Sequence, residues 1–312
     1  MESDLSTIWP LQNLWSTTDG ALPKISVIIP NYNNAEGLRR TLESLRAQNY
    51  ANLETIVMDG GSDDHSVEVI RDYEKILAHW QSTSDEGQYD AIQKGSTYVS
   101  GELMAWLNSG DIYLPWTLHL VARIFHDVSD CEWLLGLPSK MQLGVPFGMR
   151  DPGVYSARCI AHGLYRHDLL GWIQQESAFW RTELWNQVGG LRADIRYAAD
   201  YELWTRFAEH ANAYAVPMVL SGFEYGASNR SRLHFSEYVA EMDAVVREWP
   251  EQKQKRHRKW LRAFHLYQRA RSYTGIKGMV RRAFGLSKEQ GVRLKWNFDQ
   301  SVFRKNIQSV FP

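Results

Sequence analysis

Between residues 24 and 76, two short β-branched runs alternate with two helical patterns, and this alternation limits the folds open to the chain. Lys24–Pro30 and Leu53–Met58 are predicted to be buried strands, and each is followed by a polar turn and then a helix, 36–48 and 66–76. This order predicts a parallel sheet with right-handed crossovers. Ligands of such sheets bind at the carboxyl ends of the strands, so the loops that follow the strands are candidate binding loops.

Carboxylates gather in these loops. The groups are Asp59 with Asp63 and Asp64, then Asp85 with Asp90, and then Asp111 after a third predicted strand, 103–107. Acidic residues at strand ends suit a divalent cation and the ribose or base of a nucleotide. Because Asp, Gly and Ser are also ordinary turn formers, a purely structural role is the alternative for any single loop.

Composition and charge divide the chain unevenly. The 312 residues are 44% hydrophobic and 23% charged, which predicts a soluble globular protein. The net charge of −1 is the sum of two unequal parts. Residues 247–312 hold 17 Lys or Arg and 4 Asp or Glu, whereas residues 1–246 hold 18 Lys or Arg and 32 Asp or Glu. We therefore expect an N-terminal tail (1–22), a main domain (23–246) and a basic helical C-terminal extension (247–312) with an anionic partner.

Cysteine content and hydropathy bear on location. The two cysteines, Cys131 and Cys159, exclude a disulfide framework and a cysteine-rich zinc site. No apolar run reaches 18 residues, and the acidic N-terminus does not resemble a signal peptide. We expect a cytoplasmic protein, peripheral on the inner face of the cytoplasmic membrane.

Several segments together resemble a known family. Ile28–Asn33, Val57–Ser62 and Leu107–Asp111 resemble, in this order, the signatures of family-2 glycosyltransferases with the glycosyltransferase-A fold. Further segments resemble bacterial envelope-polysaccharide and exopolysaccharide members: 85–95, 175–181 and 199–204. The resemblance covers about residues 24–235. It implies an α/β, three-layer, Rossmann-like mixed sheet flanked by helices.

The resemblance also implies an activity. It predicts inverting transfer of a sugar from a nucleotide-sugar donor, with a UDP-sugar favoured, to a polysaccharide or lipid-linked glycan of the cell envelope. Donor-binding residues carried over from the family are Pro30, Tyr32, Asp59, Asp85, Asp90 and Lys94. A lysine near a diphosphate supplies a compact positive charge, although Lys94 could equally be a solvated helix residue.

The metal site implied by the resemblance departs from the family pattern. Asp111 is the candidate ligand for Mn²⁺ or Mg²⁺, which would stabilise charge on the leaving nucleotide. The family usually has acidic residues where Asn108 and Gly110 stand. Asn108 could contribute its amide oxygen, and His234 is a second candidate ligand or phosphate contact, with a structural role as its alternative.

Asp200 is the candidate general base, because an inverting transfer needs a carboxylate to take the proton of the acceptor hydroxyl. Ala199 stands where family members often have Glu. Glu202 is the rival base and a candidate substrate contact, although two residues along a helix it would point to a different face. A helix N-cap is the structural alternative for Asp200.

Aromatic residues and the basic tail support further interpretations. Candidates for stacking on the acceptor sugar are Trp172, Trp180, Trp185 and Trp204, with burial in the core as the alternative. Residues 252–271 form a basic amphipathic pattern with Trp260, Phe264 and Tyr267 as aromatic anchors for an anionic membrane. The alternative is packing of this stripe on the acidic body. No motif supports nucleic-acid binding.

Three other functions are alternatives to the glycosyltransferase hypothesis. The altered segment 108–111 leaves open a weak or inactive relative that binds a nucleotide-sugar or glycan. A nucleotidyltransferase would have a glycine-rich basic loop after the first strand, which residues 31–34 do not form. A dehydrogenase would show G-x-G-x-x-G at the same place, and it is absent.

Overall fold

The computed structural model describes residues 21–142, 145–149, 151, 153–225, 233–270, 274–297, 299–300 and 302–311. Its strands are β1 (Ile25–Asn31), β2 (Leu53–Asp59), β3 (His79–Ser82), β4 (Leu103–Trp106), β5 (Ile112–Tyr113), β6 (Trp133–Gln142), β7 (Val145–Met149), β8 (Ala178–Arg181), β9 (Ala213–Glu224), β10 (Gln290–Asn297) and β11 (Val302–Ser309). Its α-helices are α1 (Ala35–Arg46), α2 (Ser66–Asp72), α3 (Gln88–Gly95), α4 (Thr117–Asp127), α5 (Ala157–Ala161), α6 (Thr182–Val188), α7 (Ala199–His210), α9 (Phe235–Glu248), α10 (Glu251–Arg269) and α11 (Thr274–Ala283). The predicted tail 1–22 lies almost entirely outside the described residues.

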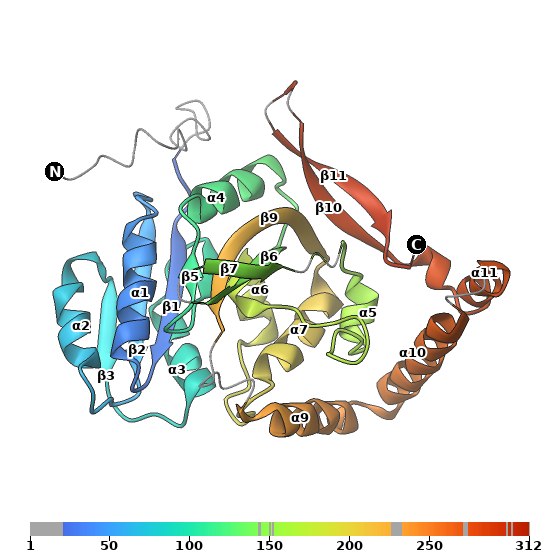
Figure 1. The fold of residues 1–312 in the computed structure, drawn as a ribbon, viewed down its shortest axis with the longest axis horizontal. Helices are drawn as coiled ribbons and strands as arrows, with labels where there is room; N and C mark the ends of the chain where they lie inside the picture. The colour runs from blue at the N-terminus through green and yellow to red at the C-terminus, as the bar shows by residue number, and fades with distance from the viewer. Residues whose placement is uncertain are drawn as a thin grey trace.

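The strands form one mixed sheet, in the order β11-β10-β9-β6-β8-β4-β1-β2-β3, with β5 beside β9 and β7 beside β6 (Figure 1). β1 is parallel to both β2 and β4, and β2 is parallel to β3, as the alternation of strands and helices predicted. β8 runs antiparallel to β4 and β6, which makes the sheet mixed. The predicted three-layer α/β fold is therefore confirmed.

Alternation along β1 explains why helices cover both faces of the sheet. Ile25, Val27 and Ile29 pack into a buried cluster with side chains of α1, α2 and α4. Ile28 points the other way, into a cluster with side chains of α3, α6 and α7. Successive side chains of a strand lie on opposite faces, so an uninterrupted apolar run requires a covered sheet on both sides.

The C-terminal region is helical as predicted, but its apolar stripe has a different role from the one expected. On α10, Phe264 is 2% and Tyr267 is 8% exposed, and both pack against Phe311. These aromatic side chains belong to the protein core, so their predicted role as membrane anchors is wrong, and the packing alternative is confirmed. No helix in the described part of the chain is long and apolar enough to span a membrane.

Residues 290–297 and 302–309 form a pair of strands that the sequence pattern did not predict. β10 pairs in parallel with β9 and antiparallel with β11, so the end of the chain extends the central sheet. The boundary predicted at residue 246 falls within α9. Between residues 131 and 173, where the sequence shows no regular apolar pattern, lie β6, β7 and α5, and β6 supplies an interior strand of the sheet.

Candidate active site

The carboxyl ends of β1 and β2 meet in register, with Asn31 opposite Asp59. Asp59 is 1% exposed and accepts hydrogen bonds from Ser62 Oγ (2.6 Å) and N (3.0 Å), Ser82 Oγ (2.6 Å) and Asn31 Nδ2 (2.7 Å). Burial raises the pKa of Asp59, but these donors outweigh it and hold the pKa below its usual value. In this structure the ionised carboxylate of Asp59 holds the surrounding strand-end loops together through these hydrogen bonds. Its contact with a nucleoside remains a prediction.

Beside Asp59 the loops approach one another closely. A Cβ on Gly60 would lie 2.9 Å from a carboxylate oxygen of Asp85, so the absence of a side chain at residue 60 allows this contact. Asp85 in turn accepts a hydrogen bond from the backbone N of Gly87 (2.8 Å). Pro30 is buried in β1, whereas Tyr32 is 67% exposed. Of the two predicted nucleobase contacts, Tyr32 is therefore the one that presents an accessible face.

Asp85, Asp90 and Lys94 lie together along α3 and the loop that precedes it. Asp90 accepts a hydrogen bond from the backbone N of Glu86 (3.0 Å) and pairs with Lys94 Nζ at 2.7 Å. The hydrogen bond that Lys94 donates to Asp90 raises the pKa of Lys94, while burial and the neighbouring Asp90 raise the pKa of Asp85. The Lys94 side chain is 46% exposed, so its ammonium group is accessible to an anionic donor.

The loop after β4 holds Asn108, Gly110 and Asp111 under α1. Thr41 Oγ1 accepts from the backbone N of Gly110 (2.9 Å) and donates to the carbonyl of Asp111 (2.7 Å). Asn108 Oδ1 accepts a hydrogen bond from Gln88 Nε2 (2.8 Å). Gly110 has a φ of +109°, a conformation that strains any L side chain. The backbone therefore disfavours the acidic residue that the family pattern would place at this position.

A chain of buried carboxylates runs from Asp111 to Asp200 through Glu176, which the sequence reasoning missed as a candidate. Burial and then Glu176 raise the pKa of Asp111 well above its usual value. Burial and then Asp200 raise the pKa of Glu176 to about 7. Glu176 is 2% exposed, and its Oε1 has no hydrogen-bond partner among the described residues. An acidic residue two positions before the apolar run 178–180 was the available signal.

Asp200, at the start of α7, is held by donors from three helices. Its Oδ1 accepts hydrogen bonds from Tyr238 Oη (2.8 Å) on α9, Tyr89 Oη (3.3 Å) on α3 and the backbone N of Tyr201 (2.8 Å). No hydrogen bond from another described residue reaches Oδ2. Burial raises the pKa of Asp200 to about 6 even though the three donors lower it. The arrangement fixes the carboxylate through one oxygen and leaves the other to accept a proton.

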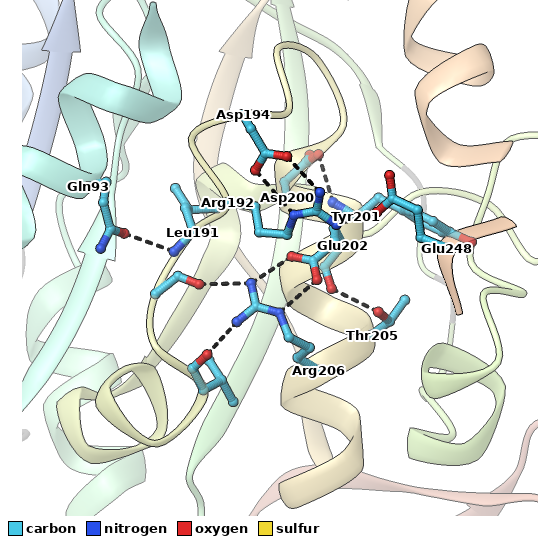
Figure 2. A network of polar contacts seen from close by, with 12 residues as sticks. Gln93, Leu191, Arg192, Asp194, Asp200, Tyr201, Glu202, Thr205, Arg206 and Glu248 are labelled. Carbon is cyan, nitrogen blue, oxygen red and sulfur yellow. Dashed lines mark hydrogen bonds and ion pairs between the residues drawn. The ribbon is translucent and has the colours of Figure 1, made fainter. Parts of the chain in front are cut away.

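Glu202 points away from this group, as the helical geometry predicted. Its two carboxylate oxygens accept hydrogen bonds from Arg206 Nε (2.7 Å) and Nη2 (2.6 Å), one turn further along α7 (Figure 2). Arg206 also donates to the carbonyls of Val188 and Gly190. The bidentate pair with Glu202 orients the Arg206 guanidinium within α7, and its bonds to the two carbonyls tie α7 to the end of α6. Glu202 therefore has a structural role here, and its predicted substrate contact has no support from this arrangement.

His234 lies at the N-terminus of α9, on the Asp200 side of the site. Its ring stacks on Tyr197 with centroids 4.8 Å apart, and its Nδ1 lies 3.3 Å from Glu237 Oε1. No hydrogen bond or ion pair joins His234 to Asp111 among the described residues, and their role as two ligands of one cation stays a prediction. Within the described ranges, no three His, Cys, Asp or Glu side chains are grouped to hold a metal ion.

The carboxylates that do fit a cation are Asp111 and its neighbour Glu176. A buried carboxylate oxygen without a partner is costly, and Glu176 Oε1 is such an atom. Mg²⁺ is typically bound through one or two carboxylates together with substrate phosphates. Asp111 and Glu176 are therefore the described side chains whose chemistry suits a divalent cation.

Three of the four candidate tryptophans are in the core. Trp180, Trp185 and Trp204 are at most 4% exposed and pack together around Trp106, which confirms the structural alternative for them. Trp172 is only partly buried, and it packs edge-on against Tyr238 with centroids 5.1 Å apart. Trp172 is therefore the candidate that adjoins Asp200.

The sheet order and the strand-end loops define a glycosyltransferase-A fold, and solved structures share it. The chain superposes on Staphylococcus aureus TarS 1–349 in complex with UDP-GlcNAc with a TM-score of 0.58 and 18% identity, covering 80% of this chain and 73% of that one. It superposes on the mannosyltransferase PcManGT of Pyrobaculum calidifontis, in complex with GDP-Man and Mn²⁺, with a TM-score of 0.53 and 16% identity, covering 91% and 93%. At these identities the likeness establishes the fold.

Sequence comparisons establish the family. Residues 26–134 match the model of glycosyl transferase family 2. An uncharacterized glycosyltransferase of Mycobacterium tuberculosis is 31% identical over 204 residues, 65% of this chain and 75% of the relative. A PGL/p-HBAD biosynthesis glycosyltransferase of Mycobacterium bovis is 31% identical over 219 residues, 66% and 79%. The chain belongs to the family-2 glycosyltransferases.

Proposed function

We propose that this glycosyltransferase inverts configuration as it transfers a sugar, with Asp200 as the general base. The observation that carries the proposal is the clamp on Asp200 Oδ1 by Tyr238, Tyr89 and the backbone of Tyr201, which leaves Oδ2 available. A pKa of about 6 suits a base that must be ionised near neutral pH and still accept a proton.

In the proposed reaction, an acceptor hydroxyl oxygen attacks the anomeric carbon of the donor sugar from the face opposite the nucleotide. The bond between the anomeric carbon and the phosphate oxygen breaks, and the nucleoside diphosphate leaves with its electron pair. The acceptor proton passes to Asp200 Oδ2 as the new carbon–oxygen bond forms. Lys94, accessible beside Asp90, supplies positive charge near the diphosphate.

The donor we propose is a nucleotide sugar, with a UDP-sugar favoured. TarS, which has this fold, was crystallised with UDP-GlcNAc and with UDP. The acceptor we propose is a polysaccharide or lipid-linked glycan of the cell envelope, reached at the cytoplasmic face of the membrane. The mycobacterial relative in PGL/p-HBAD biosynthesis supports an envelope role.

A divalent cation, Mn²⁺ or Mg²⁺, is part of the proposal. Asp111 would hold it, with Glu176 as the neighbouring carboxylate. When bound, the cation would stabilise the negative charge of the leaving diphosphate. A Mn²⁺-bound structure of a mannosyltransferase with this fold supports the assignment.

Replacement of Asp200 by Asn tests the general base. We expect Asp200→Asn to abolish transfer and to retain donor binding, measured as the thermal shift produced by UDP and UDP-sugars. Asp194→Asn is the matched control, since Asp194 is 66% exposed and pairs with Arg192 (Figure 2). Turnover near the wild-type level in Asp200→Asn would refute the assignment. Wild-type protein that binds a donor without transferring or hydrolysing it would indicate the alternative, a nucleotide-sugar-binding protein.

A further inference from the structure

A basic hollow between α10 and α11 lies away from the carboxylates of the candidate active site. It has a volume of about 270 Å³ and is lined by Lys255, Arg258, Lys259, Arg262 and Phe284. The four cationic residues follow one another at helical spacings of three, one and three along α10, so they share one face of the helix. Phe284, the residue directly after α11, forms an apolar wall.

The cationic side chains of this basic hollow are mostly free of acidic partners. All four residues are exposed. Lys255 pairs with Glu251 at 2.6 Å, on the surface, where such pairs contribute little. No ion pair within the described chain involves Arg258, Lys259 or Arg262. Four cations packed along about 10 Å of helix repel one another, and an anionic ligand would relieve that repulsion.

The opposite face of α10 shows why these charges point outward. His257 is buried and its Nδ1 lies 2.7 Å from the carbonyl oxygen of His162, while Phe264 and Tyr267 are in the core. The helix is therefore attached to the body by its apolar side, at the edge of the molecule (Figure 1). Its basic face needs no charge partner for folding, because the apolar side already anchors the helix.

Exposed apolar side chains accompany the charges on the same two helices. Leu266 on α10 is 42% exposed and Met279 on α11 is 64% exposed. Basic residues mixed with a few apolar ones suit the boundary between lipid headgroups and acyl chains. A single soluble phosphate would need neither the length of the cationic row nor the apolar neighbours.

We propose that the basic hollow and the face around it dock onto the phosphate headgroups of an anionic phospholipid surface. Docking would be electrostatic, with Leu266 and Met279 as shallow contacts, and not through the buried aromatic stripe. The inference rests on the proposed function only for the location of the acceptor. Docking through the basic hollow would hold the enzyme beside a lipid-linked acceptor without a membrane-spanning segment.

Co-sedimentation of the full chain with vesicles tests this inference. The variant neutralises the hollow with Lys255→Gln, Arg258→Gln, Lys259→Gln and Arg262→Gln. The matched control removes the same charge from exposed residues of α1, α2 and the turn after α2, with Arg40→Gln, Arg46→Gln, Arg71→Gln and Lys75→Gln. Vesicles of phosphatidylglycerol mixed with phosphatidylcholine are compared with vesicles of phosphatidylcholine alone.

We expect the wild type and the control to bind the anionic vesicles only, and binding to weaken with added salt. Each basic residue at an anionic surface raises affinity about fivefold, so the hollow variant should lose about a hundredfold or more. Equal binding by the hollow variant and the wild type would overturn the inference. So would a thermal shift of the wild type with inorganic phosphate or pyrophosphate, lost in the hollow variant, without vesicle binding. Because sedimentation needs no turnover, an inactive protein that still binds vesicles would refute the proposed function alone.

Discussion

Replacement of Tyr238 by Phe gives a sharp test of how Asp200 is tuned. The substitution removes the hydroxyl that donates to Asp200 Oδ1 at 2.8 Å and keeps the ring that packs on Trp172. The hydrogen bond from Tyr238 lowers the pKa of Asp200 against the larger effect of burial. Without it, the ionised carboxylate is less stable and the pKa must rise.

The size of the shift follows from the hydrogen bond. A hydrogen bond to a charged acceptor contributes about 1.5 kcal/mol or more, and 1.36 kcal/mol corresponds to one pKa unit. The pKa of Asp200 should therefore move from about 6 to about 7. At pH 6 the ionised fraction falls from about one half to about one tenth, a fivefold loss, whereas above pH 8.5 it stays nearly complete.

The assay is the pH profile of kcat/KM for transfer. We expect its acid limb to move up by about one unit in Tyr238→Phe, with rates that converge with the wild type at alkaline pH. Tyr89→Phe should shift the limb less, since its contact is longer at 3.3 Å. Glu176 also faces Asp200 and titrates nearby, so the informative quantity is the difference between variants.

Tyr201→Phe is the matched control. Its hydroxyl donates to the carbonyl of Gly163, and its backbone N, which survives the substitution, donates to Asp200. We expect no shift of the acid limb in this variant. A uniform loss of activity at every pH in Tyr238→Phe, with an unmoved limb, would show that Tyr238 supports packing only and would refute the reasoning.

Glu176→Gln should change the free energy of unfolding differently at the two ends of the titration of Glu176. We expect the change to be more stabilising at pH 8 than at pH 5 by about 2 kcal/mol, measured by thermal melts at both pH values. The pKa of Glu176 in the folded protein, about 7, lies above its unfolded value, so the folded state binds the extra proton and its stability falls as pH rises from about 4.5 to 7. If the substitution changed the free energy of unfolding equally at both pH values, the raised pKa of the buried Glu176 carboxylate would be refuted. For the cation, we expect EDTA to suppress transfer and Mn²⁺ to restore it, whereas full activity in EDTA would show that Asp111 holds no metal.

Local sequence patterns were enough to predict the parallel half of the sheet and the edge at which a ligand would bind. The period of the apolar residues defined β1, α1, β2 and α2 within a few residues, because these elements bury a continuous stripe or strand. The alternation of strand and helix placed Asp59, Asp85 and Asp111 at the same edge of the sheet. β9, β10 and β11 were not predicted, since strand pairing is a long-range property.

The sequence alone determined the parallel part of the sheet, the edge of that sheet where ligands bind, the residue types at this edge and the family. Only the tertiary structure decided their roles. Tyr89 and Tyr238 lie 111 and 38 residues from Asp200, and only the packing of α3 and α9 around α7 brings their hydroxyls to one oxygen. Burial is likewise a property of the whole fold, and it makes Glu176 a titrating group while leaving Glu202 neutralised by Arg206. The sequence gives the positions of the carboxylates, but the folded environment of each one sets its pKa and so decides which of them can take a proton.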